Sequence, residues 1–162
     1  MFSIFKIFRK KKVVPHIRLS GVIGSVGKFK QGLNFDSQQA IIEKAFSTKK
    51  ALAIAISINS PGGSPVQSHL IYSYIRKQAK KNKKRVLVFA EDVAASGGYL
   101  IACAGDEIYA NSSSIVGSIG VIYAAFGLQD LIKKAGIQRR IYTAGKNKST
   151  LDPFVEEKKE DI

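Results

Sequence analysis

Two apolar runs, each followed by a glycine-containing turn and a helix pattern, constrain the fold of this chain more than any other feature. The first run covers residues 52–58 and ends in Asn59-Ser60-Pro61-Gly62-Gly63. The second covers residues 85–90 and leads into Ala94-Ala95-Ser96-Gly97-Gly98-Tyr99. Near-continuous apolar runs are typical of parallel strands that helices cover on both faces. The sequence therefore predicts an α/β fold with a mostly parallel sheet, right-handed crossovers and flanking helices.

The other elements follow from apolar spacing and from capping signals. A first strand is predicted at residues 16–23 and a loop at residues 24–34, and Asp36 is predicted to cap the next helix. Ser64 and Pro65 start a helix with a predicted buried stripe of Val66, Leu70, Ile71, Tyr74 and Ile75. A third helix pattern covers residues 99–104. Further strands are predicted at residues 107–110 and 138–143, and a short helix at residues 129–135.

Length and cysteine content limit the class of protein. A chain of 162 residues is expected to form one main domain, which we place at residues 16–162. The single cysteine, Cys103, excludes an internal disulfide, and its apolar surroundings predict a small core residue. Because the sequence has no cysteine–histidine cluster, neither a metal site nor a cofactor is expected.

The formal net charge of +14 is concentrated in two blocks, residues 6–12 and 76–85. Residues 1–15 combine an apolar, aromatic run with a basic flank, which predicts either a segment lying on an anionic membrane surface or a frayed terminus. Solvated helix ends are the simpler interpretation of the second block. No aromatic residues are interleaved with the charges, so nucleic acid is not an expected partner.

Ser96 lies where the second apolar run meets a helix pattern. A hydroxyl there would be exposed beside free backbone N–H groups, where the helix dipole favours negative charge. Helix capping by Ser96, with the glycines easing a tight turn, is the alternative. Ligands of parallel α/β folds sit at the carboxyl ends of strands, so Ser96 and the Gly62-Gly63 turn are expected to face one crevice.

A serine nucleophile needs a base and donors for the oxyanion. The N–H groups of Gly62 or Gly63 and of Gly97 could be those donors. No histidine follows Ser96 in the sequence, and His69 is interpreted as a solvated or core residue. A lysine is the other established base for such a serine.

Four motifs recur in the same order in a known family. They are Asn59-Ser60-Pro61-Gly62-Gly63, Ala95-Ser96-Gly97-Gly98-Tyr99, Val116-Gly117-Ser118-Ile119-Gly120-Val121, and Lys148 with Pro153-Phe154. From about residue 17 onward the chain resembles signal peptide peptidase A (protease IV) and its SohB-type relatives. The resemblance implies a fold related to the Clp protease and crotonase superfamily. It also implies a serine endopeptidase that cuts apolar peptides, such as signal peptide remnants, with a Ser–Lys dyad.

The resemblance assigns roles to residues of this chain. Ser96 matches the nucleophile, Lys148 the general base and Ser118 the serine that hydrogen-bonds the lysine. Gly62, Gly63 and Gly97 match the oxyanion hole. Lys146 is close to Lys148 in sequence, but the distance from Lys148 to Pro153 fits the family pattern.

The resemblance also carries expectations about the whole protein. Family members continue well beyond the point that matches residue 162, so the domain is expected to be incomplete at its C-terminal end. Many members carry a transmembrane helix where this chain has a short amphipathic stretch, which predicts a cytoplasmic protein, peripheral on the inner face of the membrane. A homo-oligomer is expected, as is an apolar substrate groove that includes Tyr99, Leu100 and residues 121–126.

Two other functions stay open at this point. A crotonase-type acyl-CoA enzyme would use glycine-turn amides to hold a thioester oxyanion, and Ser96 would be incidental. A non-enzymatic basic module would bind membranes or nucleic acid through its charge.

Overall fold

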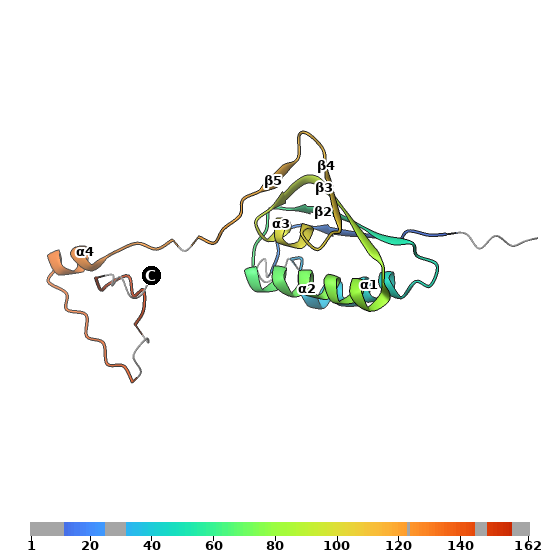
Figure 1. Cartoon of the computed structure of the whole chain (residues 1–162). Helices are drawn as coiled ribbons and strands as arrows, with labels where there is room; N and C mark the ends of the chain where they lie inside the picture. The colour runs from blue at the N-terminus through green and yellow to red at the C-terminus, as the bar shows by residue number, and fades with distance from the viewer. Residues whose placement is uncertain (1–11, 25–31, 123, 145–148, 157–162) are drawn as a thin grey trace, which may run out of the picture. The chain divides into compact units, whose positions relative to one another are not determined.

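The computed structural model describes residues 12–24, 32–122, 124–144 and 149–156 (Figure 1). Its contacts divide the chain into two compact units, Met1–Gly120 and Val121–Ile162, which are described separately below. In the described part of the chain, no helix has the length and apolar character needed to cross a membrane. The single domain predicted at residues 16–162 stays a prediction.

The first unit contains a parallel sheet in which the strands lie in the order β1-β2-β3-β4. These strands are β1 (His16–Ser20), β2 (Ala53–Ser60), β3 (Arg85–Ala95) and β4 (Glu107–Ala110). The short strand β5 (Ile115–Gly117) pairs with the carboxyl end of β3, beyond the part of β3 that pairs with β4. The predicted parallel α/β architecture is confirmed.

Helices α1 (Phe35–Ser47), α2 (Pro65–Asn82) and α3 (Gly97–Ala102) connect these strands. Figure 1 shows α1 and α2 along the same side of the sheet, and α3 packs against α2. The strands are added to the sheet in sequence order, always at the same edge. When every crossover is right-handed, this order places all the connecting helices on one face of the sheet. The expectation of helices on both faces is therefore wrong for the described part of this unit. The second face carries half-buried and exposed side chains of β1, β2 and β3.

The core lies between the sheet and the helices. Its fully buried side chains include Phe46, Ile54, Ile56, Ile71 and Val88. The stripe predicted for α2 is only partly right. Ile71 and Ile75 are buried, but Val66 is 67% exposed and Leu70 40%. Ser68, Gln78 and Ala79 are buried instead. Ser68 is buried because the glycine-rich start of α3 packs against α2 at this point.

The structure corrects two predictions at the ends of helices, one for the start of α1 and one for the end of α3. The N-cap of α1 is Asn34, whose side chain accepts a hydrogen bond from the Ser37 backbone, and Asp36 lies in the first turn. Cys103 is exposed as the C-cap residue of α3, while the neighbouring Ala102 and Ala104 take the buried positions.

The second unit contains helix α4 (Gln129–Lys134), as the sequence predicts. The Leu128 N–H donates to the Pro153 carbonyl at 2.6 Å, and Arg139 pairs with Asp152 at 2.7 Å. The Arg139 guanidinium also lies 4.9 Å from the centre of the Phe154 ring. Residues 138–143 form no strand, because no neighbouring strand in this unit's described residues offers them backbone partners.

Candidate active site

Ser96 occupies a strained turn between β3 and α3. Its backbone has φ 52° and ψ −119°, and its N–H donates to the Gly117 carbonyl at 2.8 Å. Positive φ in a residue other than glycine costs about 1–3 kcal/mol and is found where a turn must expose a functional side chain. Ser96 is the N-cap residue of α3, but its side chain makes no capping hydrogen bond to the helix. The residue is half-buried, and within the described part of the chain its hydroxyl makes no hydrogen bond.

Gly62 lies directly against this turn. A Cβ at Gly62 would be 2.8 Å from the Ala95 carbonyl oxygen, the Gly97 nitrogen and the Ser96 Cβ. The φ of Gly62 is +99°, a conformation that side chains rarely adopt. The structure thus brings together the two glycine-containing turns that the sequence placed at neighbouring strand ends.

Gly63 and Gly97 are held by close packing on other elements. Gly63 pairs with Ile23, and Ile23 exchanges its hydrogen bonds with the residues on either side of Gly63. The Gly63 N–H therefore points away from Ile23. A Cβ at Gly97 would be 2.2 Å from the Oγ of Ser68, a buried residue of α2. The N–H groups of the first turn of α3 have no partner inside the helix, which leaves Gly97 N–H available near Ser96.

Ser118 follows the strand that flanks Ser96. β5 pairs with β3 so that Gly117 lies opposite Ala95, and Ser118 is the next residue, with φ 55° and an exposed side chain. Its backbone is therefore next to the Ser96 turn. Lys148 and Lys146 lie outside the described residues. The roles given to Ser96, Ser118, Lys148 and the three glycines stay predictions.

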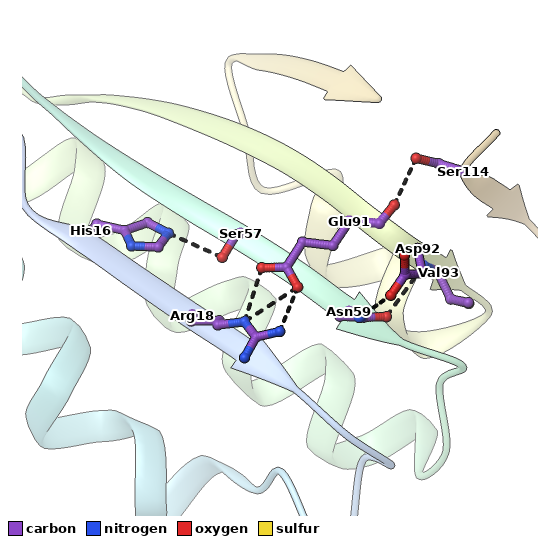
Figure 2. Close-up of polar contacts among 8 residues, drawn as sticks. All are labelled: His16, Arg18, Ser57, Asn59, Glu91, Asp92, Val93 and Ser114. Atoms are coloured by element: carbon purple, nitrogen blue, oxygen red, sulfur yellow. Dashed lines mark hydrogen bonds and ion pairs between the residues drawn. The ribbon is translucent and has the colours of Figure 1, made fainter. Parts of the chain in front are cut away.

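A polar cluster on the open face of the sheet holds these turns in place (Figure 2). The β2–β3 register shifts between Ile58 and Ser60, so that Asn59 faces the extra residues of β3. The Asn59 amide nitrogen donates to Asp92 Oδ2 at 2.8 Å, and its oxygen accepts from the Val93 N–H at 3.3 Å. Asn59 thereby ties the start of the Gly62-Gly63 turn to the part of β3 that ends at Ser96.

The same face carries an ion pair that crosses β2. Arg18 of β1 binds the Glu91 carboxylate of β3 through two nitrogens, at 2.6 Å for the shortest contact. Hydrogen bonding from Arg18, assisted by Ser57, lowers the pKa of Glu91 to about 2, against a smaller opposing effect of desolvation. Ser57 also lies 3.0 Å from His16 Nε2, and the Ser114 hydroxyl donates to the Glu91 carbonyl at 2.6 Å. The cluster joins β1, β2, β3 and the approach to β5.

This cluster was not predicted from the sequence, although the sequence contains one signal for it. Glu91 and Asp92 interrupt an otherwise apolar segment between residues 85 and 95, and two acidic residues inside a strand pattern indicate a bulge or an exposed edge. The pairing of Arg18 with Glu91 depends on the strand order and has no local signal.

A family model and several protease-named relatives match this chain. The model of peptidase family S49 matches residues 78–161, which are 84 of the 162 residues and include Ser96, Ser118 and Lys148. The chain is 37% identical over 130 residues to "Serine protease SPPA, chloroplastic" of Arabidopsis thaliana, covering 76% of this chain and 19% of that protein.

A second relative carries a different name. The chain is 60% identical over 150 residues to a protein of Brucella melitensis named "Na(+)/H(+) antiporter NhaA", covering 92% of this chain and 20% of that protein. The chain spans about a fifth of the length of each of these relatives, and their names refer to the whole proteins. Among solved structures, a ClpP1 N165D mutant from Listeria monocytogenes is similar with a TM-score of 0.40 and 22% identity, over 56% of this chain and 46% of that one.

Proposed function

The chain belongs to peptidase family S49, and from this premise we propose that it acts as a serine endopeptidase with Ser96 as the nucleophile. The observation that carries the proposal is the strained Ser96 turn with Gly62 packed against it. This arrangement presents a hydroxyl near the backbone N–H groups of Gly63 and Gly97, which is what acyl transfer from a peptide requires, while the Gly62 N–H donates to Ser60 Oγ at 3.1 Å.

In the proposed reaction the Ser96 oxygen attacks the carbonyl carbon of the scissile peptide bond. The hydroxyl proton passes to the neutral amine of Lys148, and the carbonyl oxygen becomes an oxyanion bound by the N–H groups of Gly97 and of the Gly62-Gly63 turn. Lys148 then gives the proton to the leaving amine, and water hydrolyses the acyl-enzyme ester with Lys148 again as base. Ser118 is proposed to position the lysine amine.

Labelling with a fluorophosphonate tests the nucleophile. The full chain is expected to be labelled at Ser96, and Ser96→Ala is expected to abolish both labelling and peptide cleavage while the far-UV circular dichroism spectrum stays unchanged. The alternative acyl-CoA chemistry does not require this hydroxyl. Cleavage or labelling that survives in Ser96→Ala would overturn the assignment.

A matched pair of lysines tests the base. A free lysine titrates near ~10.4, so a lysine base needs a lowered pKa to work near neutral pH. Lys148→Ala is expected to abolish cleavage, whereas Lys146→Ala keeps most of it. In wild type and in Lys146→Ala, activity is expected to rise with pH on one limb that reports the lysine base. Equal losses in the two variants would show that Lys148 is not the base.

The substrate part of the proposal is an apolar peptide, such as a signal peptide remnant. Tyr99 and Leu100 follow the nucleophile, and residues 121–126 are apolar in sequence, which supports a groove for small or aliphatic side chains. Profiling a peptide library with wild type and Ser96→Ala tests this. A preference for acidic residues before the scissile bond would contradict it.

Assembly and location are further parts of the proposal. Soluble oligomers usually form closed, symmetric assemblies, and we propose that this chain self-associates. Light scattering on the active protein tests the assembly, and a fully active monomer would contradict it. A cytoplasmic location on the inner face of the membrane is proposed as well, and fractionation of cells that express the full chain tests it.

A further inference from the structure

Positive charge gathers at the end of the first unit opposite Ser96. In a parallel sheet with helical crossovers, strands begin where helices end, so α1 and α2 finish beside the starts of β2 and β3. The exposed cations there are Lys44, Lys49, Lys50, Lys77, Lys80, Lys81, Lys83 and Arg85. We call this set the basic edge. These cations span 41 positions of the sequence, from Lys44 to Arg85, and the ends of α1 and α2 come together only in the fold.

Most of this charge is not neutralised. In the described part of the chain, Arg76 pairs with Asp106 at 2.9 Å and Arg85 pairs with Glu107, but the seven lysines of the basic edge have no ion-pair partner. Glu43 of α1 is the other acid nearby in sequence, and it is exposed. A hollow of about 580 Å³ opens here, with Arg76, Lys80, Lys83 and Arg85 among the residues that line it.

Exposed aliphatic side chains lie among these cations. Val13 is 39% exposed and Leu52 57%. They are held together by hydrogen bonds from the Val13 N–H to the Lys50 carbonyl and from the Leu52 N–H to the Val13 carbonyl. In the sequence, Val13 is preceded by Phe2, Phe5 and Phe8 and then by four cations. Nucleic acid phosphates require cations alone, whereas a lipid headgroup layer above acyl chains accommodates both kinds of side chain.

We propose that the basic edge docks on bilayers that contain anionic phospholipids. Each lysine near an anionic surface strengthens binding about five-fold, and the effect weakens as salt screens the surface. The ten steps along β3, at ~3.3 Å each, separate Arg85 from Ala95 by roughly 33 Å. Docking therefore leaves the Ser96 turn on the side of the unit away from the lipid. The proposal does not depend on peptidase activity.

Vesicle co-sedimentation of the full chain tests the proposal. The probes are vesicles of phosphatidylcholine alone and of phosphatidylcholine with 30 mol% phosphatidylglycerol. One variant combines Lys50→Gln, Lys80→Gln and Lys83→Gln at the basic edge. The control combines Lys133→Gln, Lys134→Gln and Arg140→Gln, which are exposed residues of the second unit and lower the net charge equally. The N-terminal segment is identical in all three proteins.

Wild type is expected to bind the phosphatidylglycerol vesicles, to lose binding as NaCl rises from 0.05 to 0.5 M, and not to bind phosphatidylcholine. The basic-edge variant is expected to bind on the order of 100-fold more weakly, and the control within about three-fold of wild type. Equal weakening by both variants, or no binding of wild type, overturns the proposal. The proposal is also overturned if wild type binds a 25-base-pair DNA duplex and not vesicles, and the basic-edge variant loses the binding of DNA.

Discussion

The two ends of the sheet in the first unit are built in different ways. At the carboxyl end, glycines at positive φ and a strained serine pack so closely that a Cβ added at Gly62 would be 2.8 Å from neighbouring backbone atoms. At the amino end, lysines extend into solvent without ion-pair partners among the described residues. A function that depends on backbone geometry fails when one atom is added. A function that depends on summed charge changes gradually, so single substitutions should separate the two ends clearly.

The largest effect is expected for Gly62→Ala. Its added Cβ would lie 2.8 Å from backbone atoms of residues 95 and 97, in a turn with φ +99°. Relieving both the overlap and the positive φ requires the turn to move, and we expect a loss of roughly 3 kcal/mol or more in the free energy of unfolding. Urea denaturation measures the stability, and fluorophosphonate labelling of Ser96 is expected to fall at least 100-fold.

Gly21→Ala is the matched control for this prediction. Gly21 has φ +104°, but nothing lies within 4 Å of the Cβ that it would carry. Gly21→Ala therefore has the cost of the positive φ without any steric overlap, and we expect it to lower the free energy of unfolding by about 1 kcal/mol. It should leave the labelling of Ser96 unchanged. Similar behaviour of the two variants would show that close approach at Gly62 does not set the site.

Asn59→Ala is expected to have the next largest effect. The amide holds both Asp92 and the Val93 N–H at the shifted register of β2 and β3. Its removal should cost about 1–3 kcal/mol and slow Ser96 labelling about ten-fold, since the Gly62-Gly63 turn loses its tie to β3. Asn82→Ala is the comparison at the opposite end, where the amide donates to the Gln78 carbonyl at 2.9 Å. It should lower stability by a similar amount without affecting labelling, and slower labelling in that variant would contradict the local role of Asn59.

The sequence predicts this fold well where a pattern is local. The strands β2 and β3 could be predicted from continuous apolar runs alone, and the start of α2 from Ser64 and Pro65 alone. The prediction fails where a distant element decides. Ser68 is buried, and Val66 is exposed, because α3 approaches α2 at that point. Helices on one face follow from the strand order, which no local pattern contains.

The candidate site divides in the same way. Ser96, Gly62 and Gly97 could be placed together because the carboxyl ends of parallel strands meet at one edge. The tie through Asn59 could not be foreseen, since it depends on a register shift between two strands. Lys148 is assigned by resemblance alone, because its structure lies outside the described residues.

Two adjacent lysines test whether the amino end is only a charged surface. Lys84 Nζ donates to the carbonyls of Phe46 and Thr48 at 2.7 Å each, at the end of α1, whereas Lys83 is exposed. Lys84→Met is expected to cost about 1 kcal/mol, because carbonyls at a helix end lose their donor. Lys83→Met should change stability by less than about 0.5 kcal/mol. Equal effects in thermal denaturation would show that Lys84 acts only as surface charge.

The smallest effect is expected for Arg18→Gln, and pH reveals it. Arg18 lowers the pKa of Glu91 to about 2, so the folded state favours the ionised carboxylate. The resulting stability is fully present above the pKa of Glu91 in the unfolded chain, near ~4.3, and is lost as the pH falls toward 2. Wild type should therefore exceed Arg18→Gln slightly in urea midpoint at pH 6, and the difference should shrink steadily between pH 4.5 and pH 2.5. Because the pair is exposed, salt should reduce the difference at pH 6 as well. A difference that stays constant with pH would mean that Arg18 acts through packing on β2 and not through the charge of Glu91.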